Sequence, residues 1–338
     1  MSEIRVGIIG FGYWGPNLTR NFFEIPDSVL IGIADLKDDQ LARAKAKYPH
    51  IAVVKDYHEL FTLGLDAVVI STPPSTHFKI AKECLQNGLH VLIEKPMTDS
   101  SADAKELIEL ADAGGLILMV GHTFEYNTAV LALKQYINNK DLGDIYYLDT
   151  ARLNLGLYSR KSNVLWDLAT HDISILLFLL EKKPISVSAQ AVPCVLNGVY
   201  DVAYLSLLFP NNLTAYVHVS WLDPCKVRRV TVVGSQKMAV YNDMEAEAKI
   251  KIYDKGVDAP GYTNGFGEFQ YNYRSGDISI PVIRYQEPLR QECEHFIESI
   301  INHTEPRSSG RVGLNVIKII EAALRSIENG SSHEVIEW

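Results

Sequence analysis

The chain has 338 residues, of which 47% are hydrophobic and 22% charged, and its formal net charge is −9 at pH 7. This length exceeds what one typical hydrophobic core organises, so the sequence predicts two domains. The acidic balance excludes nucleic acid or an anionic membrane as the main partner, because phosphate backbones are bound through clustered Lys and Arg. The four widely spaced cysteines, without a C-x-x-C pair, predict buried free thiols in a reducing compartment.

The N-terminus reaches a charged strand pattern within five residues, which leaves no room for the apolar region of a secretory signal. The longest apolar stretch, ISILLFLL at 173–180, is too short to span a bilayer. We therefore expect a cytoplasmic protein.

The first 122 residues alternate short apolar runs with helix-like segments. Strands are predicted at 4–10, 29–35, near 53, 65–72, 90–96 and 116–122, and helices at 15–24, 38–48, 75–87 and 100–113. Strands that are almost continuously Val, Ile and Leu, separated by helices, indicate a parallel sheet covered on both faces. Residues 1–122 are thus predicted to form an α/β domain.

From residue 123 the pattern changes to runs rich in Val, Tyr and Thr, separated by turn residues. Strands are predicted at 185–193, 199–209, 213–221, 227–234 and 237–241, helices at 127–139, 164–181, 286–303 and 311–328, and a long loop at 256–277. This pattern indicates an α+β domain over residues 123–338, built on one large, mainly antiparallel open sheet. Its last helices could pack back on the first domain.

The stretch Gly10-Phe11-Gly12-Tyr13-Trp14-Gly15 has the form G-x-G-x-x-G, follows a predicted strand and opens a predicted helix. In that context the pattern is the fingerprint of a dinucleotide-binding, or Rossmann, domain. Gly10 permits the tight turn, Gly12 lets the backbone approach a pyrophosphate, and Gly15 allows close packing of helix on strand. The helix N-terminus then offers free N–H groups to the anion. A glycine turn without a ligand is the alternative.

An acidic residue, Asp35, stands 20 positions after Gly15 at the end of the second predicted strand. Such a carboxylate accepts hydrogen bonds from the adenosine ribose and repels a 2′-phosphate, so it favours NAD. Lys37 softens that preference and keeps NADP as the alternative. The residues between the glycines, Phe11, Tyr13 and Trp14, are assigned to the same cofactor site.

Two further strand ends lie at the same predicted edge, in STPPSTHF at 71–78 and HVLIEKP at 90–96. Ligands of open parallel sheets bind beyond the carboxyl ends of strands. We therefore add the residues of these two segments to the predicted cofactor crevice: Thr72, Pro73, His77, Glu94 and Lys95. An exposed loop lysine is the alternative interpretation of Lys95.

The segment NVLWDLATHDISILLFLL at 163–180 contains Asp167 and His171, which share one face of a helix because they are four residues apart. A carboxylate beside an imidazole is a usual way to tune a general base near neutral pH. A helix-surface pair or a buried structural histidine is the alternative. His58, His295 and Cys293 have no metal-ligand spacing, so no metal is predicted.

Taken together, G-x-G-x-x-G, the Thr-Pro-Pro-x-x-His segment, Glu-Lys-Pro and D-x-x-x-H resemble the glucose-fructose oxidoreductase, inositol dehydrogenase and rhizopine catabolism oxidoreductase family (Gfo/Idh/MocA). The resemblance covers essentially the whole chain. It implies an NAD(P)-binding Rossmann domain and a second domain whose open sheet mediates homodimers or homotetramers. It also implies that Lys95, Asp167 and His171 are catalytic. The segments GYWG and NVLWDLATHDIS look most like members that act on nucleotide-linked sugars, such as UDP-N-acetylglucosamine 3-dehydrogenases.

The expected reaction is oxidation of a secondary sugar alcohol by hydride transfer to nicotinamide. His171 is then the general base, Asp167 orients it, and Lys95 polarises the oxygen. Arg152, Asn154, Tyr158 and Arg160 are candidate contacts of a sugar or nucleotide-sugar substrate, with plain surface positions as the alternative. A dehydrogenase of a free polyol such as an inositol, and a non-catalytic NAD(P)-sensing regulator, are the alternative functions.

Overall fold

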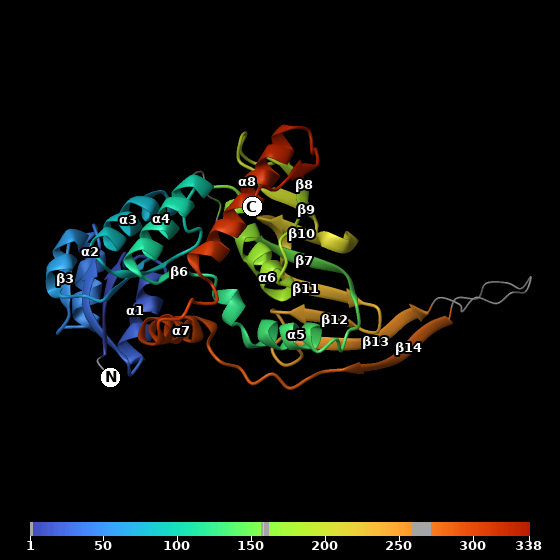
Figure 1. Ribbon diagram of the computed structural model, residues 1–338, viewed down its shortest axis with the longest axis horizontal. Helices are drawn as coiled ribbons and strands as arrows, with labels where there is room; N and C mark the ends of the chain where they lie inside the picture. Colours follow the sequence, from blue (N-terminus) through green and yellow to red (C-terminus); the bar gives the residue numbers. More distant parts are fainter. Residues whose placement is uncertain (1–2, 157, 159–161, 259–271) are drawn as a thin grey trace, which may run out of the picture. The chain divides into compact units, whose positions relative to one another are not determined.

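The structure is a computed structural model that describes residues 3–156, 158, 162–258 and 272–338 (Figure 1). The chain divides into two compact units, and each is described by itself below. The first comprises residues 1–126 and 286–321, and the second comprises residues 127–285 and 322–338. Helix α7 (Pro288–Asn302) therefore belongs to the first unit, and α8 (Gly310–Glu328) runs from the first unit into the second.

The first unit is built on a parallel six-stranded sheet in the order β3-β2-β1-β4-β5-β6. Its strands are β1 (Ile4–Ile9), β2 (Ser28–Ala34), β3 (Ala52–Val54), β4 (Ala67–Ile70), β5 (His90–Ile93) and β6 (Leu118–Val120). Its other helices are α1 (Gly15–Glu24), α2 (Asp38–Lys47), α3 (His77–Gln86) and α4 (Ser101–Gly114), with a 3-10 segment η1 (Tyr57–Leu63). The strand order reverses between β1 and β4, which is where open parallel sheets bind ligands.

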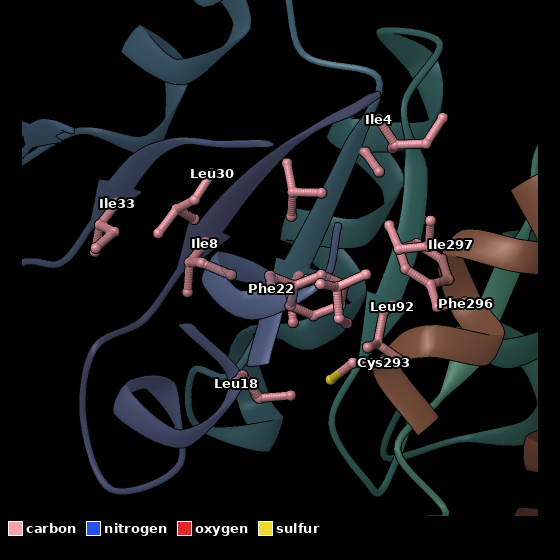
Figure 2. Close-up of a cluster of buried hydrophobic side chains, with 14 of the residues drawn as sticks. Ile4, Ile8, Leu18, Phe22, Leu30, Ile33, Leu92, Cys293, Phe296 and Ile297 are labelled. Atoms are coloured by element: carbon pink, nitrogen blue, oxygen red, sulfur yellow. The ribbon is translucent and has the colours of Figure 1, made fainter. Parts of the chain in front are cut away.

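One buried apolar cluster of the first unit lies between this sheet and two helices, α1 and α7. Figure 2 shows Ile8 of β1 and Leu92 of β5 beside Phe22 of α1 and Phe296 of α7. The two phenyl rings meet edge to face with centroids 6.2 Å apart, and all four side chains are at most 2% exposed. Burying an apolar side chain of this size stabilises a fold by about 1.5–3 kcal/mol. Helix α7 is therefore an integral part of this core, although it comes late in the sequence.

The second unit is built on a nine-stranded sheet in the order β14-β13-β12-β11-β7-β10-β9-β8-β15, in which only β7 and β10 pair in parallel among the described residues. Its strands are β7 (Ile145–Leu155), β8 (Ser186–Val192), β9 (Val202–Leu208), β10 (Thr214–Ser220), β11 (Leu222–Gly234), β12 (Met238–Asn242), β13 (Ile250–Asp258), β14 (Asn272–Ser279) and β15 (Glu334–Val335). Helices α5 (Thr128–Asn138) and α6 (Thr170–Leu180) pack on one face of it (Figure 1). The predicted fold class, a parallel sheet followed by a large, mainly antiparallel one, is confirmed.

Side chains on the strands of this sheet alternate between the helix-covered face and an opposite face, which we call the open face. On β7, Arg152 points to α6, whereas Tyr147 lies on the open face beside Tyr216 of β10, with ring centroids 6.4 Å apart. Tyr204 of β9 and His218 of β10 stack on the same face at 4.0 Å. Aromatic side chains thus gather on the open face.

Two sequence predictions are wrong in this region. The predicted loop at 256–277 begins and ends in strands, because β13 and β14 pair with each other at the sheet edge. Residues 259–271 of that loop lie outside the described residues. The ends of β13 and β14 that fall inside the predicted loop are largely exposed and lack the apolar alternation that sequence analysis relies on. The prediction that all cysteines are buried is also wrong: all four thiols are free, but Cys194 and Cys225 are exposed.

Within the part of the chain that the structure describes, no helix is long and apolar enough to cross a membrane.

Candidate active site

The glycine-rich turn, residues 10–15, joins β1 to α1 at the point where the strand order reverses. Gly10 has φ +99°, and a Cβ there would lie 2.7 Å from the carbonyl oxygen of Ser71, which follows β4. The Ser71 hydroxyl donates to the Gly10 carbonyl at 2.8 Å. A Cβ on Gly15 would lie only 2.2 Å from the same Gly10 carbonyl oxygen. Gly10 and Gly15 are therefore required by the turn itself.

Gly12 is different, because a Cβ there would meet no atom within 4 Å and its φ lies outside the left-handed region. Nothing inside the described fold demands a glycine at this position. Helix α1 begins three residues later with Trp14 as N-cap, no side-chain cap and a proline in the first turn. Uncapped helix N-termini present N–H groups and a positive dipole end to an anion. The turn thus combines open backbone with hydrogen-bond donors, which suits a pyrophosphate.

Asp35, directly after β2, ties the glycine-rich turn to the neighbouring strand. Its carboxylate accepts the backbone N–H of Phe11 at 2.7 Å and that of Lys37 at 2.9 Å. Each carboxylate oxygen has more than one lone pair, so these bonds leave acceptor capacity for ribose hydroxyls. The negative charge stands at the carboxyl end of β2, where it disfavours a 2′-phosphate.

The residues between the glycines differ in their surroundings. Phe11 is only 2% exposed and its ring is part of the core, so its backbone alone faces the turn. Tyr13 is 83% exposed, Trp14 is 43% exposed, and their rings meet edge to face at 5.9 Å. Tyr13 and Trp14 are thus the two side chains of this turn that a ligand can reach.

His77 is one of the residues that the sequence assigns to the cofactor crevice. Its side chain is fully buried at the start of α3, with Nδ1 2.8 Å from the Pro96 carbonyl oxygen and Nε2 2.8 Å from the Thr72 carbonyl oxygen. His77 therefore holds two loops together, the one that contains Thr72 and Pro73 and the one that contains the cis Lys95–Pro96 peptide. The Thr76 hydroxyl donates a hydrogen bond to the Thr72 hydroxyl at 2.8 Å.

Lys95 follows β5 and acts electrostatically on two groups of the first unit. Its backbone N–H donates to Glu94 Oε2 at 3.3 Å. Burial raises the pKa of Glu94 to about 7, against the opposing pull of the Lys95 charge. Burial, and then the Lys95 charge, lower the pKa of His122 to about 3, so this imidazole is neutral. The charge of the half-buried Lys95 thus acts on two titratable groups of the first unit.

An acidic cluster, formed by the half-buried Glu94 and the buried Glu125 and Glu292, lies in the same unit. Burial raises the pKa of Glu292 well above its usual value, and the charges of the other two carboxyls raise it further. The Thr123 hydroxyl donates to Glu292 Oε2 at 2.8 Å. Glu125 is also buried, which raises its pKa, although the nearby Arg307 opposes the shift. Glu292 is therefore protonated in the folded chain over a range of pH in which the unfolded chain has lost the proton.

This difference predicts that stability falls as the pH rises above the usual glutamate pKa, because the folded state holds a proton that the unfolded state releases. The substitution Glu292→Gln keeps an oxygen that accepts the Thr123 hydroxyl but removes the titratable carboxyl group. We expect this substitution to make the free energy of unfolding less dependent on pH and to raise it at pH 8 by about 1–3 kcal/mol. Urea unfolding at several pH values measures this. Glu298→Gln, on the exposed side of α7, should leave the slope unchanged, and an equal slope in both variants would contradict the prediction.

In the second unit, Asp167 and His171 lie on one continuous helical segment, but Asp167 is in a π-helical turn (Leu165–Ala169) that precedes α6. Asn163 starts this turn, since its Oδ1 accepts the N–H groups of Leu165 at 3.0 Å and Trp166 at 3.2 Å. Both Asp167 and His171 are half-buried. π-Turns occur frequently at functional sites. The sequence predicts the helix but carries no signal for its wider first turn.

Trp221 is a residue of this site to which sequence analysis assigns no role. It follows β10 and is 2% exposed. Its indole N–H donates to Asp167 Oδ2 at 2.9 Å. Tyr158 packs against it with ring centroids 5.4 Å apart. The structure therefore brings together Asp167, Trp221 and Tyr158 in one region of the second unit.

Arg152, which the sequence assigns to the substrate contacts, has a partner within the second unit. Its guanidinium is buried and bonds the carboxylate of Asp172 through Nε at 2.7 Å and Nη2 at 3.5 Å, so it fixes α6 to β7. Burial raises the pKa of Asp172, and the Arg152 charge opposes the shift. Asn154, two residues along β7 on the same face, is half-buried near Gly156. Arg160 lies outside the described residues.

Among the described residues, no group of three or more His, Cys, Asp or Glu side chains is arranged to hold a metal ion.

Comparison with known proteins assigns the chain to a family. Residues 4–122 match the family model described as an oxidoreductase family with an NAD-binding Rossmann fold, and residues 130–240 match the Gfo/Idh/MocA C-terminal domain. The chain belongs to the Gfo/Idh/MocA family. As a member it is an oxidoreductase that acts on CH–OH groups and has an NAD-binding Rossmann domain, as the sequence predicts.

Two curated relatives match this Gfo/Idh/MocA chain almost from end to end. A UDP-N-acetylglucosamine 3-dehydrogenase of Acidithiobacillus ferrooxidans is 27% identical, with 94% of this chain and 95% of the relative covered. A myo-inositol 2-dehydrogenase of Thermotoga maritima is 25% identical, with 99% of each covered. A solved structure of the Acidithiobacillus ferrooxidans enzyme matches with a TM-score of 0.79 and 26% identity, over 98% of this chain and 100% of that one.

The residues of the glycine-rich turn fit the NAD that this family binds. The open space above Gly12 and the uncapped start of α1 suit the pyrophosphate, and Asp35 is placed for the adenosine ribose.

Proposed function

We propose that the chain is an NAD-dependent dehydrogenase that oxidises a secondary hydroxyl, at C3, of a nucleotide-linked sugar such as UDP-N-acetylglucosamine. The observation that carries the proposal is the similarity to the Acidithiobacillus ferrooxidans enzyme, which extends over 94% of this chain and 95% of the relative. The chain carries Lys95, Asp167 and His171, the three residues to which this proposal assigns the catalysis.

In this proposal, NAD supplies the hydride acceptor when bound, and the residues of the chain handle the proton and the charge. His171 takes the hydroxyl proton as general base, because a neutral imidazole has one ring nitrogen that accepts a proton. Asp167 orients the imidazole and stabilises its protonated form. The Lys95 ammonium group polarises the same oxygen and stabilises the negative charge that develops on it.

A second candidate substrate is a free polyol. The similarity to the Thermotoga maritima myo-inositol 2-dehydrogenase, 25% identical with 99% of each protein covered, favours it. The chemistry at the hydroxyl is the same in both cases. What differs is the recognition of a pyrophosphate, which requires additional hydrogen-bond donors or cations.

An activity screen separates these candidates. The purified protein with NAD is mixed with UDP-N-acetylglucosamine, other UDP-sugars, myo-inositol and glucose, and the absorbance of NADH is followed. We expect turnover with UDP-N-acetylglucosamine and a kcat/KM at least about 10-fold lower with the free polyols. The reverse order would establish the polyol dehydrogenase. Calorimetric binding of NAD without turnover of any sugar would instead support a cofactor-sensing regulator.

We also propose that a second copy of the chain covers the open face of the nine-stranded sheet. Three observations support this: the exposed rings of Tyr204 and Tyr216, the stacked Tyr204–His218 pair and a hollow of about 370 Å³ among these strands. Exposed aromatic surface of this kind marks interaction sites. A two-fold pairing of identical faces gives a homodimer, and two such dimers a homotetramer.

The substitution Tyr204→Glu should therefore shift the protein toward the monomer in sedimentation-velocity experiments, because it places a charge at the centre of the apolar contact. Tyr285→Glu makes the same chemical change at an exposed position before α7 and should leave the sedimentation coefficient unchanged. An assembly that is the same size in both variants would contradict pairing through the open face.

A further inference from the structure

We propose that Trp221 is a positioning residue: its indole N–H fixes the carboxylate of Asp167 and thereby the orientation of His171. This inference rests on the proposed function, in which Asp167 and His171 form the base. The contact itself is direct, since Trp221 Nε1 lies 2.9 Å from Asp167 Oδ2. An indole N–H is a donor only, so a carboxylate is its natural partner, and a bond to a charged acceptor is stronger than a neutral one.

The backbone holds Trp221 in place from two sides. Its N–H donates to the Asp201 carbonyl at 2.9 Å, and its carbonyl accepts the N–H of Gly156 at 3.1 Å. It follows Ser220, which pairs with Leu153 of β7. The residue is therefore anchored to neighbouring segments of the second unit before its side chain is considered.

The indole ring is held as well. Tyr158 packs against it at 61° with ring centroids 5.4 Å apart. A Cβ on Gly156 would lie 3.2 Å from Trp221 Cδ1, so the backbone of Gly156 closes the ring in on another side. A side chain that is 2% exposed and packed in this way has little freedom to turn. Its N–H bond therefore points in a constant direction.

Asp167 needs such an external anchor because it belongs to the π-helical turn. The wider turn alters the spacing between successive residues, so α-helical geometry alone does not set the direction of its carboxylate toward His171. Rotation about the Cβ–Cγ bond would let the carboxylate plane vary. A donor from the separate β10–β11 junction, bonded to Oδ2, removes that freedom. The carboxylate plane is then fixed relative to the helical segment that carries His171.

The test is a double-mutant cycle with NAD and either UDP-N-acetylglucosamine or myo-inositol, whichever the wild type turns over. Trp221→Phe removes the N–H and keeps most of the ring. We expect it to lower kcat by about 10-fold while KM changes by less than about 2-fold. In an Asp167→Ala background, Trp221→Phe should have no further effect on kcat, because the group through which it acts is gone.

A merely structural role predicts the same loss in both backgrounds, and that outcome would overturn the inference. A wild-type kcat for Trp221→Phe, with Asp167→Ala strongly impaired, would also overturn it but leave the proposed function standing. A wild-type kcat for Asp167→Ala would overturn the proposed role of Asp167 and the inference with it. If Trp221→Phe does not fold, benzothienylalanine at position 221 replaces the N–H by sulfur at the same size, and the same outcomes apply.

A matched control removes a buried aromatic donor elsewhere in the same unit. The hydroxyl of Tyr241, on β12, donates to Asp243 Oδ1 at 2.9 Å. Tyr241→Phe deletes that bond and should leave kcat unchanged, even where urea unfolding shows a loss of stability.

Discussion

The variants Lys95→Met and His171→Ala are expected to lower kcat by about 10²–10⁴-fold each and to leave the Kd for NAD nearly unchanged. Methionine preserves the length and apolar stem of the lysine but removes the charge that stabilises the developing alkoxide. Alanine at 171 removes the general base. Stopped-flow measurement of NADH formation gives kcat, and calorimetric titration gives the Kd for NAD.

The double variant sharpens this prediction. If both side chains act on the same hydroxyl oxygen in one step, the fold-decrease in kcat of the double variant should be smaller than the product of the two single fold-decreases. Two control variants test for general effects of losing a cation or an imidazole: Lys105→Met, whose lysine is exposed on α4, and His333→Ala, near the C-terminus. Both should retain wild-type kcat. Retention of near-wild-type kcat by Lys95→Met and His171→Ala would refute the catalytic assignment.

The first unit could be predicted well from the sequence because its signals are local. The helix predicted at 15–24 is observed at Gly15–Glu24, since it begins directly after the glycine fingerprint and ends where the apolar periodicity stops. The buried strands stand out as Val/Ile/Leu runs, because a parallel sheet is covered on both faces. The sequence assigns Gly10 to a tight turn and Gly15 to close helix packing, and in the structure a Cβ on either glycine would meet a backbone carbonyl.

The second unit shows where such local signals end. From the sequence, Arg152 is interpreted as a positively charged substrate contact. Its partner Asp172 comes 20 residues later, and only the packing of α6 on β7 brings the two together. Trp221 reaches Asp167 across 54 residues. Strand β14 and the last residues of β13 are largely exposed at the sheet edge, where pairing rather than burial defines them. Each missed feature depends on a long-range partner, which periodicity and short motifs do not encode.

The acidic cluster is a further case. Glu292 looks like one of several charged residues on an amphipathic helix, because Glu294 and Glu298 are its neighbours along α7. Glu292 is buried because it lies on the side of α7 that packs against the rest of the first unit. Only that packing places its carboxyl in contact with Thr123.

The substitution Gly12→Val is expected to weaken NAD binding by about 100-fold without destabilising the fold. No atom of the described chain lies within 4 Å of a Cβ at this position, and its backbone conformation does not require glycine. We therefore expect the free energy of unfolding, measured in urea without NAD, to change by less than about 1 kcal/mol. The loss in affinity arises because side-chain atoms would occupy the space that the pyrophosphate needs near the backbone, at the cost of one or two charge-assisted hydrogen bonds of about 1.5–3 kcal/mol each.

Gly10→Ala provides the contrast within the same turn. Its backbone has φ +99°, and the added methyl group would lie 2.7 Å from the Ser71 carbonyl oxygen. Strain of this kind costs about 1–3 kcal/mol, so this variant should lose stability even in the absence of NAD. Calorimetric titration and urea unfolding on both variants separate a glycine that serves the ligand from one that serves the fold. If Gly12→Val bound NAD like the wild type, or lost as much stability as Gly10→Ala, the space above Gly12 would not be where the pyrophosphate lies.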